Sequence, residues 1–577
     1  MVKALDAFFD SYYRLRPVNA TFTGVHRYDG EYPDWSPNGL ERARLEMAGL
    51  RAQLRAAAGG ALGTLGVGAA DWRLIDAGLA DSFLEIQLWE WQGSHFQRGN
   101  PSLAVAEAVF GIISLMVRNF APVLDRMESA AARLGAMPRF LEGARASLAA
   151  APLRDRWLQK ALRELTGART LLTLGLDRWV SREGPGTDQG RAVLAAARTA
   201  TAAIDRFADW LGSAAQDPAA SYACGRDDFA LLLSRGHWCK ASVEELRVRL
   251  RAQIVEEESR LHDRARAVHS DGWPGVQDEL ALRHPTAAGY YAAFESAWQA
   301  CRATAAAHNL VTWPDYPIRY VPIPEWTRDA APSLYYLFYR SPAPFDELPQ
   351  VEYVVTPIEV CVDAEARDRH LRAWNDSVIK LNHVVHHGAI GHHLQNWYAY
   401  RAQSRVAQVA AVDCASRIGM FLGGTMAEGW ACYATDLMDE VGFLTAHESV
   451  AEQHTRVRML ARAIVDIELH TGVMTLDDAA QFYGEHVGMP PDVAMAEATK
   501  NSMFPGTASM YWLGTQGIHD LRAECAARQG SAFSLRSFHD ALLSLGAIPV
   551  ALAREILVRQ FSPNPSAPIR SSNVRRT

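Results

Sequence analysis

Hydrophobic and polar positions repeat every three to four residues over most of this chain. From residue 70 to about residue 210 nearly every segment keeps this spacing and is rich in Ala, Leu and Arg, which favour helices. After Ser242 the chain has the Ser-x-x-Glu pattern of a capping box and keeps helical spacing to about His269. The pattern therefore predicts a mainly α-helical protein built from long helices.

Extended segments are few. Residues 318–324 and 351–356 are rich in β-branched residues, alternate in polarity and are stopped by prolines, so they predict short strands beside loops. A strand edge there could pair with an extended peptide, because its backbone groups are unpaired. A hairpin that serves only as scaffold fits the sequence equally well.

The length of 577 residues allows two to four domain-sized units or one large helical body. We predict an N-terminal helical bundle over residues 1–240 and a second helical region over residues 241–561. The proline- and serine-rich end, residues 562–577, is expected to be a disordered tail.

The composition argues against nucleic acids and membranes as partners. The net charge is -7 and no long basic run occurs, which argues against a nucleic-acid-binding protein. No stretch approaches the roughly 18 apolar residues of a membrane span. The seven cysteines are scattered and include no Cys-x-x-Cys pair, and acidic residues interrupt the N-terminus where a signal peptide needs an apolar run. We therefore expect a cytoplasmic protein without a membrane partner.

The candidate chemistry lies in residues 383–395, which read His-Val-Val-His-His-Gly-Ala-Ile-Gly-His-His-Leu-Gln and hold five of the nineteen histidines. Imidazole is the commonest zinc ligand in proteins, so this clustering predicts a metal site. Some histidine clusters are only polar helix surface.

The spacing of these histidines does not suit a straight helix. In the zinc-peptidase pattern His-Glu-x-x-His, the ligands at i and i+4 lie on one face, about 6 Å apart. His386 and His392 are six residues apart, which in an ideal helix means roughly 240° of rotation and about 9 Å of rise. A bulge or local unwinding could aim both at one ion, and Gly388 and Gly391 tolerate such a distortion.

The run resembles the signature of the bacterial family known as domain of unknown function 885, His-Glu-x-x-Pro-Gly-His-His-Leu-Gln, a widened form of the zinc-peptidase helix. The resemblance covers about residues 4–560 and implies that His386 and His392 are zinc ligands. A second segment, Glu-Gly-Trp-Ala at residues 428–431, also resembles the family and implies Glu428 as the third ligand. Two imidazoles and one carboxylate leave a tetrahedral zinc one open position for water, as in catalytic sites.

The chain departs from this signature at two positions. His387 stands where the family has its glutamate, and Ile390 stands where it has proline. A neutral His387 could accept a proton in place of the carboxylate, whose loss otherwise costs about 10² to 10⁴ in rate. Two other ligand arrangements stay open: His393 in place of His392, or His383 with His387 at i and i+4 of an undistorted helix.

Two later segments extend the resemblance. Arg462, Asp466 and His470, at i, i+4 and i+8, share one helix face. The resemblance implies catalytic roles for His470 and for Tyr511, whose phenol could polarise a carbonyl. Lys500 stands where the family has arginine; it keeps the charge without the planar fork, so carboxylate recognition there is weakened or rearranged.

The resemblance implies a zincin-like helical body that binds one zinc ion and acts on peptide or small amide substrates. Three hypotheses follow. The protein is a zinc-dependent hydrolase with His387 in place of the usual general base, or a metal-binding but catalytically impaired relative that binds peptides or scaffolds a partner, or a metal-free helical protein whose histidines only satisfy hydrogen bonds. The sequence predicts no particular oligomeric state.

Overall fold

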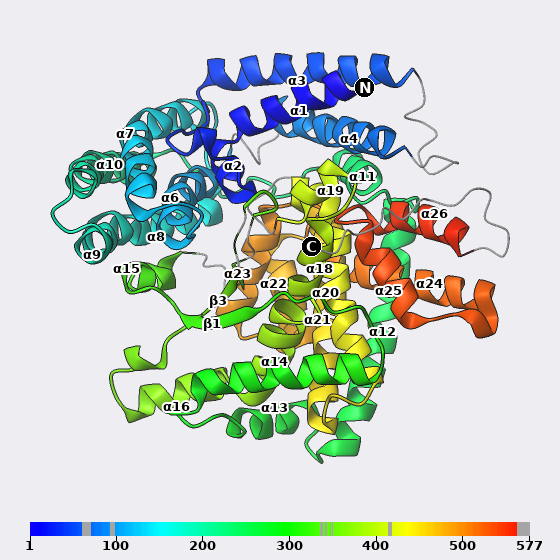
Figure 1. The fold of residues 1–577 in the computed structure, drawn as a ribbon. Helices are drawn as coiled ribbons and strands as arrows, with labels where there is room; N and C mark the ends of the chain where they lie inside the picture. Colours follow the sequence, from blue (N-terminus) through cyan, green and yellow to red (C-terminus); the bar gives the residue numbers. More distant parts are fainter. Residues whose placement is uncertain are drawn as a thin grey trace.

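The computed structural model describes residues 1–59, 71–92, 99–334, 339–340, 343–346, 348, 350–412 and 418–561. Helices make up most of these residues (Figure 1), which confirms the prediction of a mainly α-helical protein. The tail expected at residues 562–577 lies outside the described part of the chain.

The N-terminal region forms two groups of helices. The first lies across the top of the molecule in Figure 1 and consists mainly of α1 (Val2–Leu15), α2 (Pro17–Thr23), α3 (Pro37–Ala58) and α4 (Trp72–Gln92). The second lies to one side and consists of α6 (Pro101–Val117), α7 (Val123–Leu148), α8 (Asp155–Thr170), α9 (Leu176–Glu183) and α10 (Asp188–Ser213).

The rest of the chain forms a larger helical body. Its helices are α11 (Arg226–Leu231), α12 (Val243–Val268), α13 (Trp273–Leu282), α14 (Tyr290–Ala307), α15 (Glu325–Arg328), α16 (Ala364–Ala373), α17 (Asp376–Val378), α18 (His392–Ala399), α19 (Arg405–Ala410), α20 (Gly424–Glu440), α21 (Ala446–His470), α22 (Leu476–Val487), α23 (Pro491–Ser502), α24 (Met510–Gln529), α25 (Leu535–Ser544) and α26 (Val550–Gln560). The predicted capping box is present at the start of α12, where the Ser242 side chain accepts from the Glu245 N–H.

In the described part of the chain, three short strands form one sheet. They are β1 (Ile318–Pro322), β2 (Tyr339–Arg340) and β3 (Val351–Val355), in the order β1-β3-β2. The two strands predicted from the sequence, β1 and β3, are confirmed. They run parallel, with Ile318 opposite Val351, so they are not the two arms of a hairpin.

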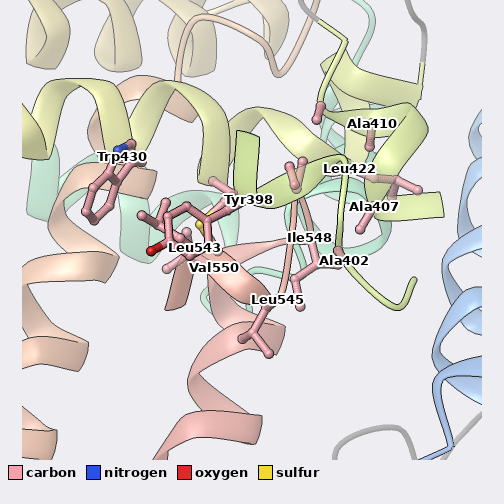
Figure 2. Packing of buried hydrophobic residues seen from close by; sticks show 14 of the residues in the cluster. Tyr398, Ala402, Ala407, Ala410, Leu422, Trp430, Leu543, Leu545, Ile548 and Val550 are labelled. Atoms are coloured by element: carbon pink, nitrogen blue, oxygen red, sulfur yellow. The ribbon is translucent and has the colours of Figure 1, made fainter. Parts of the chain in front are cut away.

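One hydrophobic core joins the first helices to the C-terminal half. It contains residues of α1, α3 and α4 together with residues of α14, α18, α20, α25 and α26, whereas α6 to α10 share a core of their own. Figure 2 shows part of the larger core, with Tyr398 and Trp430 near Leu543 and Val550. Burial is thus shared across residue 240, and the division into domains there stays a prediction.

No helix in the described ranges combines the length and the apolar character needed to cross a lipid bilayer.

Candidate metal centre

The backbone of the histidine segment is distorted, as the spacing of its histidines requires. Residues Ile379–Gly388 form a π-helix, residues 389–391 leave helical geometry, and α18 begins at His392. A π-helix has more residues per turn than an α-helix, so it changes where each side chain points. The Gly391 N–H donates to the Val385 carbonyl at 2.9 Å and closes this wide turn.

Two glycines permit the close contacts of the turn. A Cβ atom on Gly391 would lie 1.8 Å from the His386 carbonyl oxygen. A Cβ atom on Gly388 would lie 2.3 Å from the Tyr320 hydroxyl oxygen. Neither position therefore accommodates a side chain without a shift of its neighbours.

Tryptophan side chains hold the same turn from two sides. The Trp430 indole N–H, on α20, donates to the Ile390 carbonyl at 2.8 Å. The Trp298 indole N–H, on α14, donates to the Gly388 carbonyl at 3.0 Å. The turn is thus fixed to two packed helices, and Ile390, at the family's proline position, is fully buried there.

The distorted turn brings His386 and His392 to the same carboxylate oxygen. Glu428 Oε2, on α20, lies 3.6 Å from His386 Nε2 and 3.4 Å from His392 Nε2. Two ligands of a tetrahedral zinc ion, each about 2.0–2.1 Å from the metal, are roughly 3.3 Å apart. The three side chains therefore fit one zinc ion with small adjustments.

The protonation states of these groups also suit a metal. Burial lowers the pKa of His386, which favours the neutral imidazole that binds metals. Burial disfavours the Glu428 carboxylate, but the charge of His392 and the hydrogen bonds from His386 and His392 outweigh it and hold the pKa of Glu428 well below its usual range.

His387 lies in the same cluster. One ring nitrogen from each of His386, His387 and His392 can be chosen so that all three atoms lie within 4.8 Å of one another. His387 Nδ1 is 2.6 Å from the Asn382 carbonyl oxygen, which can only accept, so Nδ1 carries the proton and Nε2 keeps the lone pair. Burial, followed by the neighbouring His386 and His392, lowers the pKa of His387 well below its usual value.

The two other histidines of the segment are engaged elsewhere. His383 Nδ1 pairs with the Tyr353 hydroxyl at 2.6 Å, and its ring stacks on Trp374 at 4.3 Å. His393 Nε2 donates to the Tyr316 carbonyl at 2.8 Å, and its ring stacks on the Tyr316 ring. The three-imidazole cluster found in the described residues includes His387 but neither of these two.

The candidate centre borders a cavity of about 440 Å³. His392, Glu428 and Tyr511 line it on the side of the large helical body. Residues of α2, α6 and α8 line the cavity as well, among them Phe22, Glu107, Phe110, Lys160, Arg163 and Glu164. A substrate in this cavity would therefore contact both the N-terminal helices and the candidate centre.

Comparison with protein families gives the affiliation of the chain. Residues 17–557 match the family described as "Bacterial protein of unknown function (DUF885)". The chain belongs to this family. No curated protein matches it.

Two solved structures share the fold of this DUF885 protein. One is a "putative lipoprotein of unknown function" from Shewanella oneidensis, with 20% sequence identity, a TM-score of 0.75, and coverage of 96% of this chain and 99% of that one. The other is a "putative lipoprotein" from Colwellia psychrerythraea, with 16% identity, a TM-score of 0.73, and coverage of 97% and 98%. At these identities the likeness concerns the fold alone.

The two remaining candidate catalytic residues of this DUF885 protein have different surroundings. Tyr511 lines the cavity beside Arg462, whose guanidinium carbon lies 5.3 Å from the centre of the tyrosine ring. His470 is fully buried outside the cavity lining, with Nε2 donating to the Asn501 carbonyl at 3.0 Å. The structure thus brings Tyr511, but not His470, into the cavity that Glu428 lines.

Asp466, one turn before His470, fixes the turn that leads into α24. Its carboxylate accepts from the Gly506 N–H at 3.0 Å and from the Ser509 N–H at 2.9 Å. Burial raises the pKa of Asp466 to about 7. Since Tyr511 lies two residues after Ser509, this carboxylate helps to position it.

Arg458 of this DUF885 protein was not among the candidate residues predicted from the sequence. Its Nε atom is buried and has no hydrogen-bond partner among the described residues. Arg458 precedes Arg462 by four residues on α21, so both project from one face of that helix. The four-residue spacing from Arg462 is the signal for Arg458 in the sequence. It points to a site only because Arg462 lines the cavity.

Proposed function

We propose that this protein is a zinc-dependent hydrolase of peptide or amide bonds with a zincin-like centre. One observation carries the proposal: His386 Nε2 and His392 Nε2 lie 3.6 and 3.4 Å from one oxygen of Glu428. Two imidazoles and one carboxylate are the donor set of a catalytic rather than a structural zinc site.

The residues around the centre supply the remaining chemistry. A zinc ion held there would lower the pKa of a bound water and polarise the carbonyl of the scissile bond. The neutral His387, with its lone pair on Nε2, is the candidate that takes the proton and passes it to the leaving amine. Tyr511 is the candidate that donates a hydrogen bond to the carbonyl oxygen from the cavity wall.

We expect slow turnover from this arrangement. A protonated imidazole next to a dication is disfavoured, so His387 is a weaker base than the carboxylate that it replaces. The scattered cysteines support a cytoplasmic setting. The net charge of -7 argues against a nucleic acid as the substrate, which leaves a peptide or a small amide.

A second candidate function is favoured by the clustering of three imidazoles within 4.8 Å. If His387 enters the coordination shell with His386, His392 and Glu428, the ion has four protein ligands and no open position. Closed sites of this kind are structural. The protein would then bind a metal and a peptide without cleaving it.

Metal analysis of the purified protein tests the centre. We expect about one zinc ion per chain in the wild type and loss of zinc in His386→Ala and in Glu428→Ala. His393→Ala is the matched control, because it removes an adjacent imidazole that contacts Tyr316 instead. Zinc absent from all four proteins, or equal in all four, would remove the site.

His387→Glu separates the two functions. Activity of the zinc-loaded wild type on a peptide library, changed little by His387→Glu, supports the hydrolase. An inert wild type that gains activity from His387→Glu supports the impaired relative. In that case His387→Ala should also weaken zinc binding, because it would remove a ligand.

A further inference from the structure

The cavity beside the candidate centre is more positive than the protein as a whole. Among the described residues that line it, five are cationic: Arg16, Lys160, Arg163, Arg462 and Lys500. Three are carboxylates, Glu107, Glu164 and Glu428, and the last of these is assigned above to the metal. The whole chain carries a net charge of -7, so an excess of positive charge here is a local property of the cavity.

Two of these cations, Arg462 and Lys500, lie on the wall formed by α21 and α23. Arg462 Nε donates to Glu497 Oε1 at 2.7 Å. Burial disfavours the Glu497 carboxylate, but Arg462, Lys500 and Arg458 outweigh it and lower the pKa of Glu497 to about 2. A single carboxylate therefore lies within the field of three cations.

Arg458 differs from Arg462, which forms an ion pair with Glu497. The Nε atom of Arg458 is buried, and among the described residues it has no hydrogen-bond partner. Burial, followed by repulsion from Arg462, lowers the pKa of Arg458. A buried guanidinium N–H donor without an acceptor is destabilising, which is tolerated most readily where a ligand supplies the acceptor.

The same guanidinium lies close to the candidate metal centre. The positive charge of Arg458 contributes to the lowered pKa of His386, after burial and His392.

We propose that Arg458, Arg462 and Lys500 bind a carboxylate of the substrate next to the metal centre. This inference rests on the proposed function and narrows its substrate class to peptides that carry a carboxylate close to the scissile bond. The carboxylate is either the free C-terminus, which would make the enzyme cleave from that end, or an acidic side chain.

Peptide binding to the full chain stripped of metal tests the proposal without catalysis. Stripping is needed because a metal ion would itself bind a carboxylate. Three matched N-acetylated alanine peptides serve as probes in calorimetric titrations: one with a free C-terminus, one with a C-terminal amide, and one amide with a glutamate as its last residue. We expect at least one acidic peptide to bind about tenfold or more tightly than the neutral amide.

Comparison of the two acidic peptides identifies the source of the carboxylate. Tighter binding of the free C-terminus indicates cleavage from the end, and tighter binding of the glutamate amide indicates recognition of a side chain. Equal binding of all three peptides would overturn the proposal.

Two matched variants locate the binding groups. Arg458→Met should remove the preference for the acidic peptide without loss of stability, because it removes a buried Nε atom that has no hydrogen-bond partner among the described residues. Arg163→Met removes a cation from the α8 wall of the same cavity and should leave the preference intact. Loss of the preference in Arg163→Met alone would overturn the assignment to Arg458. Thermal unfolding of both variants verifies that they fold.

These experiments distinguish failure of the carboxylate site from failure of the proposed hydrolase function. A carboxylate preference that depends on Arg458 supports this inference even if no peptide is cleaved, and in that case the hydrolase proposal fails alone. Cleavage of the amide and the acid at equal rates by the zinc-loaded protein, with equal binding, leaves the hydrolase standing and removes the carboxylate site.

Discussion

Two of the buried clusters in this protein pair histidine with a carboxylate, and their polar atoms face different surroundings. His386, His392 and Glu428 come from a distorted turn and a neighbouring helix and meet at a cavity. Asp466 and His470 lie on one regular helix, and backbone groups of nearby turns satisfy them.

The difference separates a candidate site from a structural network. Burial and a shifted pKa occur in both clusters, so neither property identifies a site by itself. What distinguishes the first cluster is that its nitrogen and oxygen atoms converge on one point beside open space.

The largest effect is expected from Asp466→Ala. It leaves the N–H groups of Gly506 and Ser509 buried without their acceptor, which should lower the free energy of unfolding by about 3 kcal/mol. Chemical denaturation at constant pH measures the change. Zinc content should stay that of the wild type, and a variant that loses zinc while keeping its stability would reverse the roles of the two clusters.

Zinc should stabilise the protein only through the first cluster. At a free zinc concentration 100 times the Kd, the free energy of unfolding should rise by about 2.7 kcal/mol in the wild type. Glu428→Ala should show no rise, whereas His393→Ala, the control, should keep it. Thermal unfolding with and without zinc gives the result, and an equal rise in Glu428→Ala would show that zinc binds elsewhere.

Gly391→Ala should disturb the first cluster through its backbone. The new Cβ would meet the His386 carbonyl oxygen at 1.8 Å, so the turn must shift, at a cost of about 1–3 kcal/mol in stability together with weaker zinc binding. Gly49→Ala is the control, since nothing lies within 4 Å of its Cβ and alanine at this exposed position should stabilise helix α3 by about 0.5–1 kcal/mol. Unchanged zinc affinity in Gly391→Ala would mean that the wide turn does not position the ligands.

The smallest effect concerns His26, a histidine whose ring faces two carboxylates. Burial disfavours its charge, but hydrogen bonds to Asp29 and Asp346 outweigh it and raise the pKa of His26 to about 9. A pKa raised above its ordinary value of 6.5 adds stability that is complete below pH 6.5 and is lost as the pH rises to about 9.

Unfolding measured across that range should therefore show a decline in the wild type that is absent from His26→Gln. Since about a third of the side chain is exposed, solvent screens the interaction and the decline should be small. An identical pH profile in both proteins would show that His26 is not charged in the fold.

Local structure was predictable where a few neighbouring residues determine it. Ser242 with Glu245 fixes the start of α12, and the alternating residues of β1 and β3 give strands. The six-residue spacing of His386 and His392 required a distorted helix, and the glycines that permit it were visible in the sequence.

Features that depend on distant packing were not predictable. Arg462 and His470 share a helix face by their spacing, but eight residues of helix separate them by about 12 Å, and only Arg462 reaches the cavity. Contacts between segments far apart in the chain form the cavity wall of α6 and α8 and bury the Nε atom of Arg458.

Zinc K-edge X-ray absorption of the zinc-loaded wild type tests whether His386 and His392 bind the same zinc ion. We expect a first shell of nitrogen and oxygen atoms at about 2.0–2.1 Å that includes two imidazoles. A shell that contains sulfur, or that contains only water oxygens, would contradict it.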